Sequence, residues 1–308
     1  MDLDSNRLRE LALAEGYDLV GICEAKLSQA DVSNLREFVS LEYHAGMSWF
    51  SKHLEIRTNP ELFLPGVKSA LVLGLSYRSQ ESEAMFGESD VKISRYALGR
   101  DYHRVLKKKG LRLLAKIAST FPGIQGRISV DSAPVPEKIF GRMAGIGWQG
   151  KHTNLIHPRL GSYFFLSVLF LDRTFVSDIP IADGCKTCRK CIDACPTQAL
   201  EEYRIDARKC ISYLTIEEKG KIPSEFHGKT EGWIFGCDIC QEVCPYNSRK
   251  SAQIDTKERA FFPRKEILPL LGKKVPGRDE WEVAKSGSPL GRIDYERFLD
   301  RREASGLL

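Results

Sequence analysis

The stretch "GCKTCRKCIDACPTQAL", residues 184–200, contains four cysteines within eleven residues: Cys185, Cys188, Cys191 and Cys195. Their spacing is C-x2-C-x2-C-x3-C-P, the pattern of bacterial ferredoxins, in which three close cysteines bind one iron–sulfur cluster and the fourth binds a neighbouring cluster. The proline that follows ends the loop, because it cannot donate a helical hydrogen bond. The stretch therefore predicts two clusters rather than one.

A second group of cysteines lies downstream in "GCDICQEVCPYN", residues 236–247, and it also ends in Cys-Pro. This half lacks one ligand, and Cys210 lies 27 residues before Cys237, where it is available to supply it. The crossed pattern assigns eight cysteines to two sets of four. We expect one cluster on Cys185, Cys188, Cys191 and Cys244, and the other on Cys195, Cys210, Cys237 and Cys240.

Structural zinc is the alternative occupant, because zinc also binds four thiolates, often from two C-x2-C pairs. Zinc does not require the three-cysteine loop or the crossed Cys-Pro, so we predict two four-iron–four-sulfur clusters. Cys23 is the ninth cysteine, and its place in an apolar stretch predicts a buried core residue.

The composition is that of a folded globular protein, since 42% of the 308 residues are hydrophobic and 28% are charged. The longest apolar run, "YFFLSVLFL", is about half of the roughly 20 residues that a membrane-spanning helix needs. The charged N-terminus "MDLDSNRLRE" lacks the apolar core of a secretion signal, so we expect a cytoplasmic protein with no membrane partner. In that reducing compartment, clustered thiols favour metal or redox roles over disulfides.

Helix-like and strand-like stretches alternate over the N-terminal part of the chain. Amphipathic patterns predict helices at about 5–16, with Ser5 as the cap and Gly16 at the end, at about 31–38 and at about 102–119. Apolar runs predict strands, at about 17–23, 70–77, 126–130 and 161–171. This alternation predicts an α+β fold, an α/β-type sandwich of helices on a sheet.

The chain divides by composition into three predicted parts: 1–180, a cofactor- and substrate-binding domain; 181–250, a ferredoxin-like module with two clusters; and 251–308, a C-terminal helical segment. Clusters move single electrons, so the larger N-terminal part is expected to bind the electron acceptor. No G-x-G-x-x-G follows a strand, and "GIGWQGKHT" (145–153) lacks the G-K-[ST] of a P-loop because His152 follows Lys151.

Several stretches together resemble the epoxyqueuosine reductase family, and they occur in the family's order over about residues 1–250. They are "ISRYALGRDYH" (93–103), "VDSAPVPEK" (130–138), "AGIGWQGKHTNLI" (144–156), the ferredoxin-like run, and "GWIFGCDICQEVCPYN" (232–247). The resemblance implies a cytoplasmic enzyme with two four-iron–four-sulfur clusters and cobalamin. It also implies the last step of queuosine biosynthesis, the reduction of epoxyqueuosine at the wobble position of tRNA.

The chain departs from the family in two places. Longer members carry a C-terminal helical-repeat extension, whereas this chain ends soon after the clusters, so the resemblance is to a short form. The final "RREASGLL" fits the family pattern poorly, and no role is transferred to it.

Asp131 is the candidate catalytic acid. Opening an epoxide to an alkene consumes two electrons and two protons, so the departing oxygen needs a positioned proton donor. Asp131 follows a predicted strand and precedes a proline-stiffened turn, and the resemblance implies the same role at this position. The alternative is a helix cap before Pro134 or Pro136. Acid catalysis near neutral pH requires a raised pKa of Asp131, which we expect from burial against the corrin ring.

The resemblance also implies cobalamin contacts, at Arg57, Asp131, Gly150, Lys151, Asn154 and Ser212. The D-x-H-x-x-G motif that supplies a histidine ligand to cobalt is absent, because "DYHRVL" has Leu106 where glycine is required. We therefore expect base-off cobalamin without a histidine ligand. The alternatives are a surface ion pair for Arg57 and a helix cap for Ser212.

A basic block predicts the contact with tRNA, through the anticodon stem-loop that carries epoxyqueuosine. From Lys92 to Lys116 there are nine Lys or Arg against one acid, Asp101. The predicted RNA contacts are Arg100, Arg104, Lys107, Lys108 and Lys109, together with Arg95 of the same block and the aromatic rings of Tyr96 and Tyr102, which are expected to stack on unpaired bases. An ordinary solvated helix face is the alternative.

Two other functions fit parts of the sequence. One is a reductive dehalogenase-like cobalamin enzyme with a small organohalide substrate, and the missing export signal and the basic block argue against it. The other is a ferredoxin-type electron carrier, and the size of the N-terminal part argues against that. In the leading interpretation we expect a monomer that receives electrons from an external donor.

Overall fold

Four strands form the central sheet in a computed structural model that describes residues 3–86, 89–248 and 255–307. Every neighbouring pair in the sheet is antiparallel. The spatial order is β1 (Leu19–Glu24), β2 (Ser69–Ser76), β7 (Phe164–Leu171), β4 (Gly126–Ser129). All eight residues of β2 are buried, as expected for a central strand that is covered on both faces.

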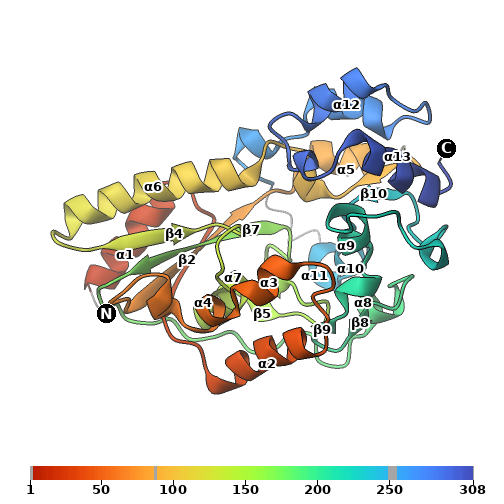
Figure 1. Ribbon diagram of the computed structural model, residues 1–308. Coiled ribbons are helices and arrows are strands. Elements are labelled where there is room, and N and C mark those ends of the chain that lie inside the picture. The colour runs from red at the N-terminus through yellow and green to blue at the C-terminus, as the bar shows by residue number, and fades with distance from the viewer. Residues whose placement is uncertain (1–2, 87–88, 249–254, 308) are drawn as a thin grey trace.

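Helices cover both faces of this sheet, and the side chains of β2 alternate between two cores. Leu71 and Leu73 pack in one core with α1 (Leu3–Ala14) and α6 (Tyr102–Thr120). Ala70 and Val72 pack in the other with Cys23 and with Phe140 of α7 (Glu137–Met143). Figure 1 shows α1 and α6 on one side of the sheet, and α2 (Gln29–Ser40), α4 (Leu54–Thr58) and α7 on the other. The chain is thus a mixture of helices and strands, and Cys23 is the buried core residue that was predicted.

Two details of the predicted helices differ in the structure. Ser5 lies inside α1, and its hydroxyl accepts a hydrogen bond from the Val176 amide at 2.8 Å, so it is not the cap of this helix. Gly110 lies on the buried face of α6, where a Cβ atom would come within 2.7 Å of the Ile128 side chain. The glycine therefore permits the close approach of α6 to β4.

Short helices occupy the irregular stretch between β1 and β2. They are α3 (Ser48–Lys52), α4 and the 3-10 turn η1 (Pro60–Leu62). The polar residues of this stretch lie outside the sheet, which leaves several of its side chains beside the large cavities described below.

The cysteine-rich module is built from elements of two to six residues, consistent with a fold that is held by bound groups rather than by a large core. In order these are α8 (Lys190–Asp193), β8 (Leu200–Glu201), β9 (Arg204–Ile205), η3 (Ala207–Lys209), α9 (Ile211–Ile216), η4 (Ser224–Phe226), β10 (Trp233–Phe235), α10 (Ile239–Glu242) and α11 (Pro245–Ser248).

The C-terminal segment packs on the cluster module and on the stretch after β2. Its elements are η6 (Arg259–Phe261), η7 (Lys265–Leu271), α12 (Arg278–Lys285), η8 (Pro289–Arg292) and α13 (Tyr295–Ala304). Trp281 and Phe298 share a buried core with Ile93 and Phe235. Strand β3 (Lys92–Ile93) also pairs in parallel with β10, so packing crosses both predicted domain boundaries. The remaining elements are α5 (Gln80–Phe86), η2 (Arg95–Ala97), β5 (Trp148–Gln149) and β6 (Leu155–Ile156).

Among the residues that the structure describes, no helix is long and apolar enough to span a membrane.

Candidate active site and cluster pockets

One cavity of about 190 Å³ is lined by four cysteines that come from two separate stretches of the chain, Cys185, Cys188, Cys191 and Cys244. Burial raises the pKa of the Cys191 thiol to about 11, and the other three cysteines of this cavity add to the shift. The indole of Trp148 donates toward Cys185 Sγ at 3.5 Å. These are the four residues that the crossed pattern groups together, and a polycationic centre would stabilise their thiolates.

The other four cysteines, Cys195, Cys210, Cys237 and Cys240, are each partly buried. Burial raises the thiol pKa of Cys210, Cys237 and Cys240, and electrostatic repulsion from the neighbouring cysteines adds to each shift. Cys195 contributes to this repulsion at Cys210 and Cys240, which agrees with the set predicted for it, and Cys191 of the first group also acts on Cys240, so the two groups are neighbours. Within the described ranges no three His, Cys, Asp or Glu side chains converge as for a single metal ion. Two neighbouring groups of four thiols are the donor set that polynuclear clusters require.

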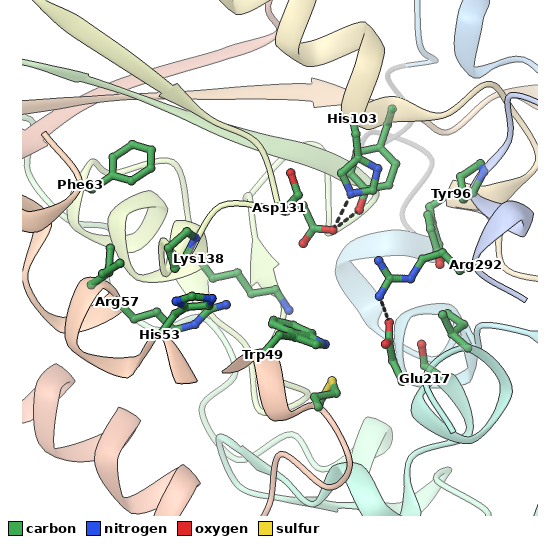
Figure 2. A pocket seen from close by; sticks show the side chains of 18 of the residues that line it. Trp49, His53, Arg57, Phe63, Tyr96, His103, Asp131, Lys138, Glu217 and Arg292 are labelled. Carbon is green, nitrogen blue, oxygen red and sulfur yellow. Dashed lines mark hydrogen bonds and ion pairs between the residues drawn. The ribbon is translucent and has the colours of Figure 1, made fainter. Parts of the chain in front are cut away.

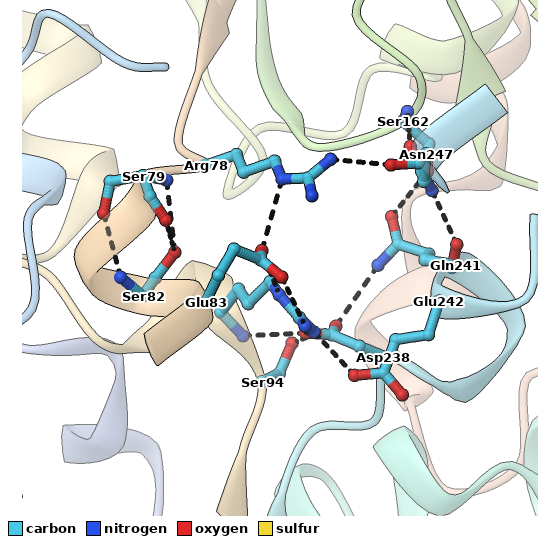
Figure 3. Close-up of polar contacts among 11 residues, drawn as sticks. Arg78, Ser79, Ser82, Glu83, Ser94, Ser162, Asp238, Gln241, Glu242 and Asn247 are labelled. Carbon is cyan, nitrogen blue, oxygen red and sulfur yellow. Dashed lines mark hydrogen bonds and ion pairs between the residues drawn. The ribbon is translucent and has the colours of Figure 1, made fainter. Parts of the chain in front are cut away.

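A buried ion network ties the second cysteine group to the rest of the chain (Figure 3). Asp238 is fully buried directly after Cys237, and it accepts hydrogen bonds from the Ser94 hydroxyl and from the backbone and guanidinium of Arg95. Arg95 also pairs with Glu83 of α5 and with Glu242 of α10. Arg95 is therefore an internal cation that joins α5 to the cluster module, not an RNA contact.

The same network continues to the start of β7 (Figure 3). The Asn247 side chain accepts from the Ser162 amide at 2.7 Å and donates to the Ser162 hydroxyl at 2.9 Å. That hydroxyl donates to Gln241, and Arg78 donates to the Asn247 carbonyl at 2.6 Å. The loop that carries Cys240 and Cys244 is thus fixed to the sheet by fully hydrogen-bonded polar groups.

A much larger cavity, of about 850 Å³, lies beside β4 and the cluster module. Five separated stretches line it, within residues 47–63, 96–103, 127–138, 212–217 and 289–292. Three of the residues predicted from the sequence are among them, Arg57, Asp131 and Ser212. Residues that the sequence did not single out also line it, namely His53, Lys138, Glu217 and Arg292. Figure 2 shows the paired Arg292 and Glu217 across the cavity from Asp131.

Asp131 forms a hydrogen-bonded group with two residues at the start of α6 (Figure 2). Its Oδ2 accepts from the Tyr102 hydroxyl at 2.6 Å and lies 2.9 Å from His103 Nε2. His103 Nδ1 lies 2.7 Å from Asp101 Oδ1, so the imidazole bridges two carboxylates. Helix α7 begins at Glu137, and Pro136 occupies its cap position without a side-chain bond. The alternative of Asp131 as a helix cap is therefore wrong.

The charges in this group differ from the expected ones. Burial acts to raise the pKa of Asp131, but the hydrogen bonds from His103 and Tyr102 outweigh it, so the pKa is lowered. The structure therefore differs from the expectation of a raised pKa at Asp131. Burial likewise opposes charge on His103, yet its bonds to Asp101 and Asp131 raise the pKa of His103 to about 9. At neutral pH the available proton therefore resides on His103, next to an ionised Asp131.

A second cavity, of about 890 Å³, adjoins the first, and both are lined by Trp49, Arg57, Asp131 and Lys138. The Arg57 guanidinium lies over the rings of Phe50, at 4.4 Å from the centroid, and Trp49, at 5.3 Å. Arg57 is buried, and its Nε has no hydrogen-bond partner among the described residues. Such a cation suits a ligand polar group better than a surface ion pair.

The three predicted cofactor contacts in the loop at residues 150–154, Gly150, Lys151 and Asn154, do not line either large cavity, although Thr153 of the same loop lines the second. Lys151 is buried and pairs with Glu202 at 2.8 Å, beside the small cavity of Cys185. Asn154 accepts a hydrogen bond from Lys138 Nζ at 2.7 Å, so it supports a cavity residue from behind. A Cβ atom on Gly150 would come within 2.5 Å of the Ile156 side chain, which gives this glycine a packing role.

The predicted RNA contacts divide between the surface and the interior. Four of them are exposed near the N-terminal half of α6, Arg100, Arg104, Lys107 and Lys108. Lys109 is only 8% exposed and pairs with Glu258 at 3.4 Å, so its prediction as an RNA contact is wrong. Tyr96 and Tyr102 line the large cavity instead of the outer surface. Tyr102 stacks on Phe165 with a ring-centroid separation of 4.2 Å.

Known proteins with similar sequences and structures identify the family. The family model "Epoxyqueuosine reductase QueG, DUF1730" matches residues 57–132, and a 4Fe-4S double cluster binding domain matches residues 184–247. An epoxyqueuosine reductase of Leadbetterella byssophila is 46% identical over 263 residues, covering 85% of each chain. One of Escherichia coli is 35% identical over 304 residues, covering 96% of this chain and 78% of that relative.

A solved structure gives the same result for the fold. It is an epoxyqueuosine reductase with a tRNA-Tyr epoxyqueuosine-modified stem loop, 29% identical, with a TM-score of 0.80 over 97% of this chain and 79% of that one. The matched stretches include Arg57, Asp131 and all eight grouped cysteines. The chain therefore belongs to the epoxyqueuosine reductase family.

Proposed function

We propose that this epoxyqueuosine reductase acts on epoxyqueuosine in tRNA, with cobalamin in the two large cavities and a four-iron–four-sulfur cluster at each cysteine group. One observation carries the proposal: helix α9 begins directly after Cys210, and its residues Ser212 and Ile216, with Glu217 directly after the helix, line the same cavity as Asp131. A ligand of one cluster and the candidate acid thus border one reaction space.

A second contact supports this short electron path. Lys138 lines both large cavities, and the cysteines Cys240 and Cys210 are near enough to act electrostatically on its amine. Burial lowers the pKa of Lys138, and these two sulfur groups oppose that change. Lys138 thus borders both the cavities and the thiols that would hold the second cluster.

The two cavities suit a large flat cofactor with a polar rim. The first cavity has a volume of about 850 Å³ and the second about 890 Å³, and Trp49 and Arg57 line both. Arg57 brings the unpartnered Nε described above, and Trp49 and Phe63 offer apolar ring surface. Both ring nitrogens of His103 lie within hydrogen-bond distance of aspartates. This agrees with the expectation that cobalamin would bind without a histidine ligand. Cobalamin would supply low-valent cobalt as the electron donor to the epoxide.

The chain's own residues would manage the protons of the reaction. Reduction of the epoxide to the alkene takes two electrons and two protons and releases water. His103 would pass its proton to Asp131, whose carboxyl group would donate it to the epoxide oxygen, and a proton from solvent would reload His103 for the second transfer. Tyr102 would hold the Asp131 carboxylate in place through its hydroxyl. Because the carboxylate of Asp131 is 55% exposed, it is open to a substrate that enters the cavity.

The tRNA proposal follows from the relative that was solved with a modified stem loop. In this chain the exposed cations of α6, including Arg104 and Lys107, start next to Tyr102 and His103. A phosphate backbone along α6 would leave the modified base directed toward the cavity. The proposal also includes that the protein is a monomer and that an external donor supplies its electrons.

Asp131→Asn is the direct test. The amide keeps the size of the side chain but cannot deliver a proton, so kcat on an epoxyqueuosine stem loop should fall about 100- to 10,000-fold. Iron, sulfide and bound cobalamin, measured on the same anaerobic preparations, should match the wild type. Near-normal turnover would remove Asp131 from the mechanism.

The wild-type protein tests the assignment as a whole. Failure to bind any corrinoid would leave a ferredoxin-type carrier as the better description. Corrinoid binding without turnover of the stem loop, but with dehalogenation of a bromophenol, would favour the dehalogenase-like alternative.

A further inference from the structure

The candidate acid lies in a turn whose backbone conformation needs support. Asp131 has a φ angle of +44°, in the left-handed region that L-residues other than glycine rarely adopt. The turn from Asp131 to Pro136 separates β4 from α7 and contains no regular secondary structure. A residue held in this region persists only where its surroundings fix it.

Glu137 makes the contacts that fix this turn. Its Oε1 accepts a hydrogen bond from the Asp131 backbone amide at 2.7 Å and another from the Ser129 hydroxyl at 2.9 Å. Ser129 is the last residue of β4 and is fully buried, whereas Glu137 is the first residue of α7. One carboxylate oxygen therefore joins the end of the strand, the catalytic turn and the start of the helix.

The two carboxylates have separate positions in the site. The side chain of Asp131 is directed toward Tyr102 and His103, whereas Glu137 reaches Asp131 only through the backbone amide. Glu137 does not line the 850 Å³ cavity that holds this group, although it lines the adjoining 890 Å³ cavity with Asp131. Because its contact with Asp131 is to the backbone amide and not to the carboxylate, its effect on proton transfer would be indirect.

We propose that Glu137 is a positioning residue that locks the Asp131 turn in the conformation from which the carboxylate meets Tyr102 and His103. The proposal rests on the function proposed above, since it gives Asp131 a catalytic role. Without the Glu137 contact, the left-handed conformation of Asp131 loses its backbone support, and the carboxylate leaves its two partners for part of the time.

Glu137 can hold the Asp131 turn in either of its protonation states. Burial raises the pKa of Glu137 to about 8, and the neighbouring Asp131 carboxylate adds to this shift. The bonds from Ser129 and from the Asp131 amide oppose it, as does the charge on His103, and Arg57 and Lys138 are the other cations that face Glu137. Since a carbonyl-type oxygen accepts from an amide in either protonation state, the lock does not depend on the charge.

Three variants separate positioning from charge and from folding. Glu137→Gln keeps an oxygen acceptor at the same reach, so turnover should stay within about threefold of the wild type. Glu137→Asp keeps the charge but is shorter by one methylene group, so kcat should fall about 10- to 100-fold while KM for the stem loop stays within about twofold. Ser129→Ala removes the other bond to Glu137 and leaves the Asp131 contact, so it is the matched control.

Hydrogen exchange at the Asp131 amide reports on the lock without any use of activity. Peptides that contain Asp131 should exchange faster in Glu137→Asp than in wild type, Glu137→Gln or Ser129→Ala, while peptides from β7 stay unchanged. In the Asp131→Asn background, Glu137→Asp should cost no further turnover, because its effect acts through Asp131.

Unchanged exchange in Glu137→Asp would overturn the lock, as would a loss of kcat in Glu137→Gln as large as in Glu137→Asp. A further loss in the Asp131→Asn background would also overturn it, since it would give Glu137 a separate role. A wild-type protein with no turnover would refute the proposed function alone, because the exchange result would still decide whether Glu137 holds the turn.

Discussion

The cluster module and the large cavity are specified by the sequence in different ways. The cysteines repeat at short fixed intervals, and seven of the eight come from two stretches of 17 and 12 residues. The cavity beside them is lined by five separated stretches, from Met47 to Arg292. A metal cluster requires several identical ligands at close range, which a local motif supplies. A reaction cavity requires different groups facing one another, which the fold brings together.

This difference predicts how each region responds to change. Removal of one cysteine should act on a whole cluster, because a cluster binds through all of its thiolates together. Removal of one cavity residue should alter a rate or an affinity and leave the cofactors in place. The experiments below test that contrast, and they are ordered by the size of the expected effect.

Substitution of a cysteine should give the largest loss. In Cys244→Ala the first cluster loses a ligand, so the iron content should fall from about eight to about four per chain and turnover should be abolished. Cys23→Ala is the control: Cys23 is buried in the apolar core of the sheet, so the iron content should stay near eight. Iron and sulfide analysis with visible absorbance measures both.

Pairs of substitutions test the crossed grouping itself. Cys185→Ala added to Cys244→Ala should remove no more iron, because the two residues line one cavity. Cys240→Ala added to Cys244→Ala should remove nearly all of it, although these two residues lie in the same stretch. The reverse result would assign each cluster to one stretch and contradict the crossed pattern.

His103 should give the next largest effect, through the pH dependence of turnover. Its bonds to Asp101 and Asp131 raise its pKa to about 9, so the proton that supplies Asp131 is present below that pH and is lost above it. The rate should therefore fall as pH rises through about 9. His103→Gln should turn over about 10- to 100-fold more slowly and lack this alkaline limb.

The raised pKa of His103 also predicts how the stability of the fold changes with pH, and it suggests a second variant, at Asp101. The charged His103 stabilises the fold fully below its unfolded pKa near 6.5, and this contribution is lost as pH rises through about 9. Asp101→Asn removes one of the two partners, so the alkaline limb should move to lower pH. A limb that stays at the same pH in both variants would assign it to another group.

The contrast between a local motif and a cavity built by the fold also explains which features of the structure the sequence could predict. The strands β2 and β7 and the place of Asp131 after β4 rest on local patterns, and the structure has them. The cysteine grouping also rests on a local pattern, and the structure places the four cysteines of the first predicted set around one cavity. The partners of Asp131 lie in "DYHRVL", a stretch that the sequence presents as an incomplete cobalt-binding motif, with Tyr102 as an expected RNA contact. His103 reaches Asp131 because of the way α6 packs against β4, and a local sequence pattern does not predict that packing.

The burial of Lys109 could have been predicted from its position in the helix. The buried positions of α6 are Leu106, Lys109, Gly110, Leu113 and Ile117, an ordinary helical stripe with spacings of three and four. Lys109 falls on this stripe, so its position in the helix outweighs its charge. Arg292 had no such signal, because it reaches the cavity from a segment more than 150 residues after Asp131.

The surface of α6 should give the smallest effect, on affinity rather than on chemistry. Changing Lys107 and Lys108 together to Glu should weaken tRNA binding and lower the slope of log affinity against log salt by about 2, one for each lost phosphate contact. The turnover of bound substrate should stay near the wild-type value, because both side chains are exposed and outside the cavity. Lys109→Met is the control on the same helix. Its loss of the Glu258 pair should reduce stability and leave the salt slope unchanged. Equal slopes in the wild type and the double variant would place the RNA on another face of the protein.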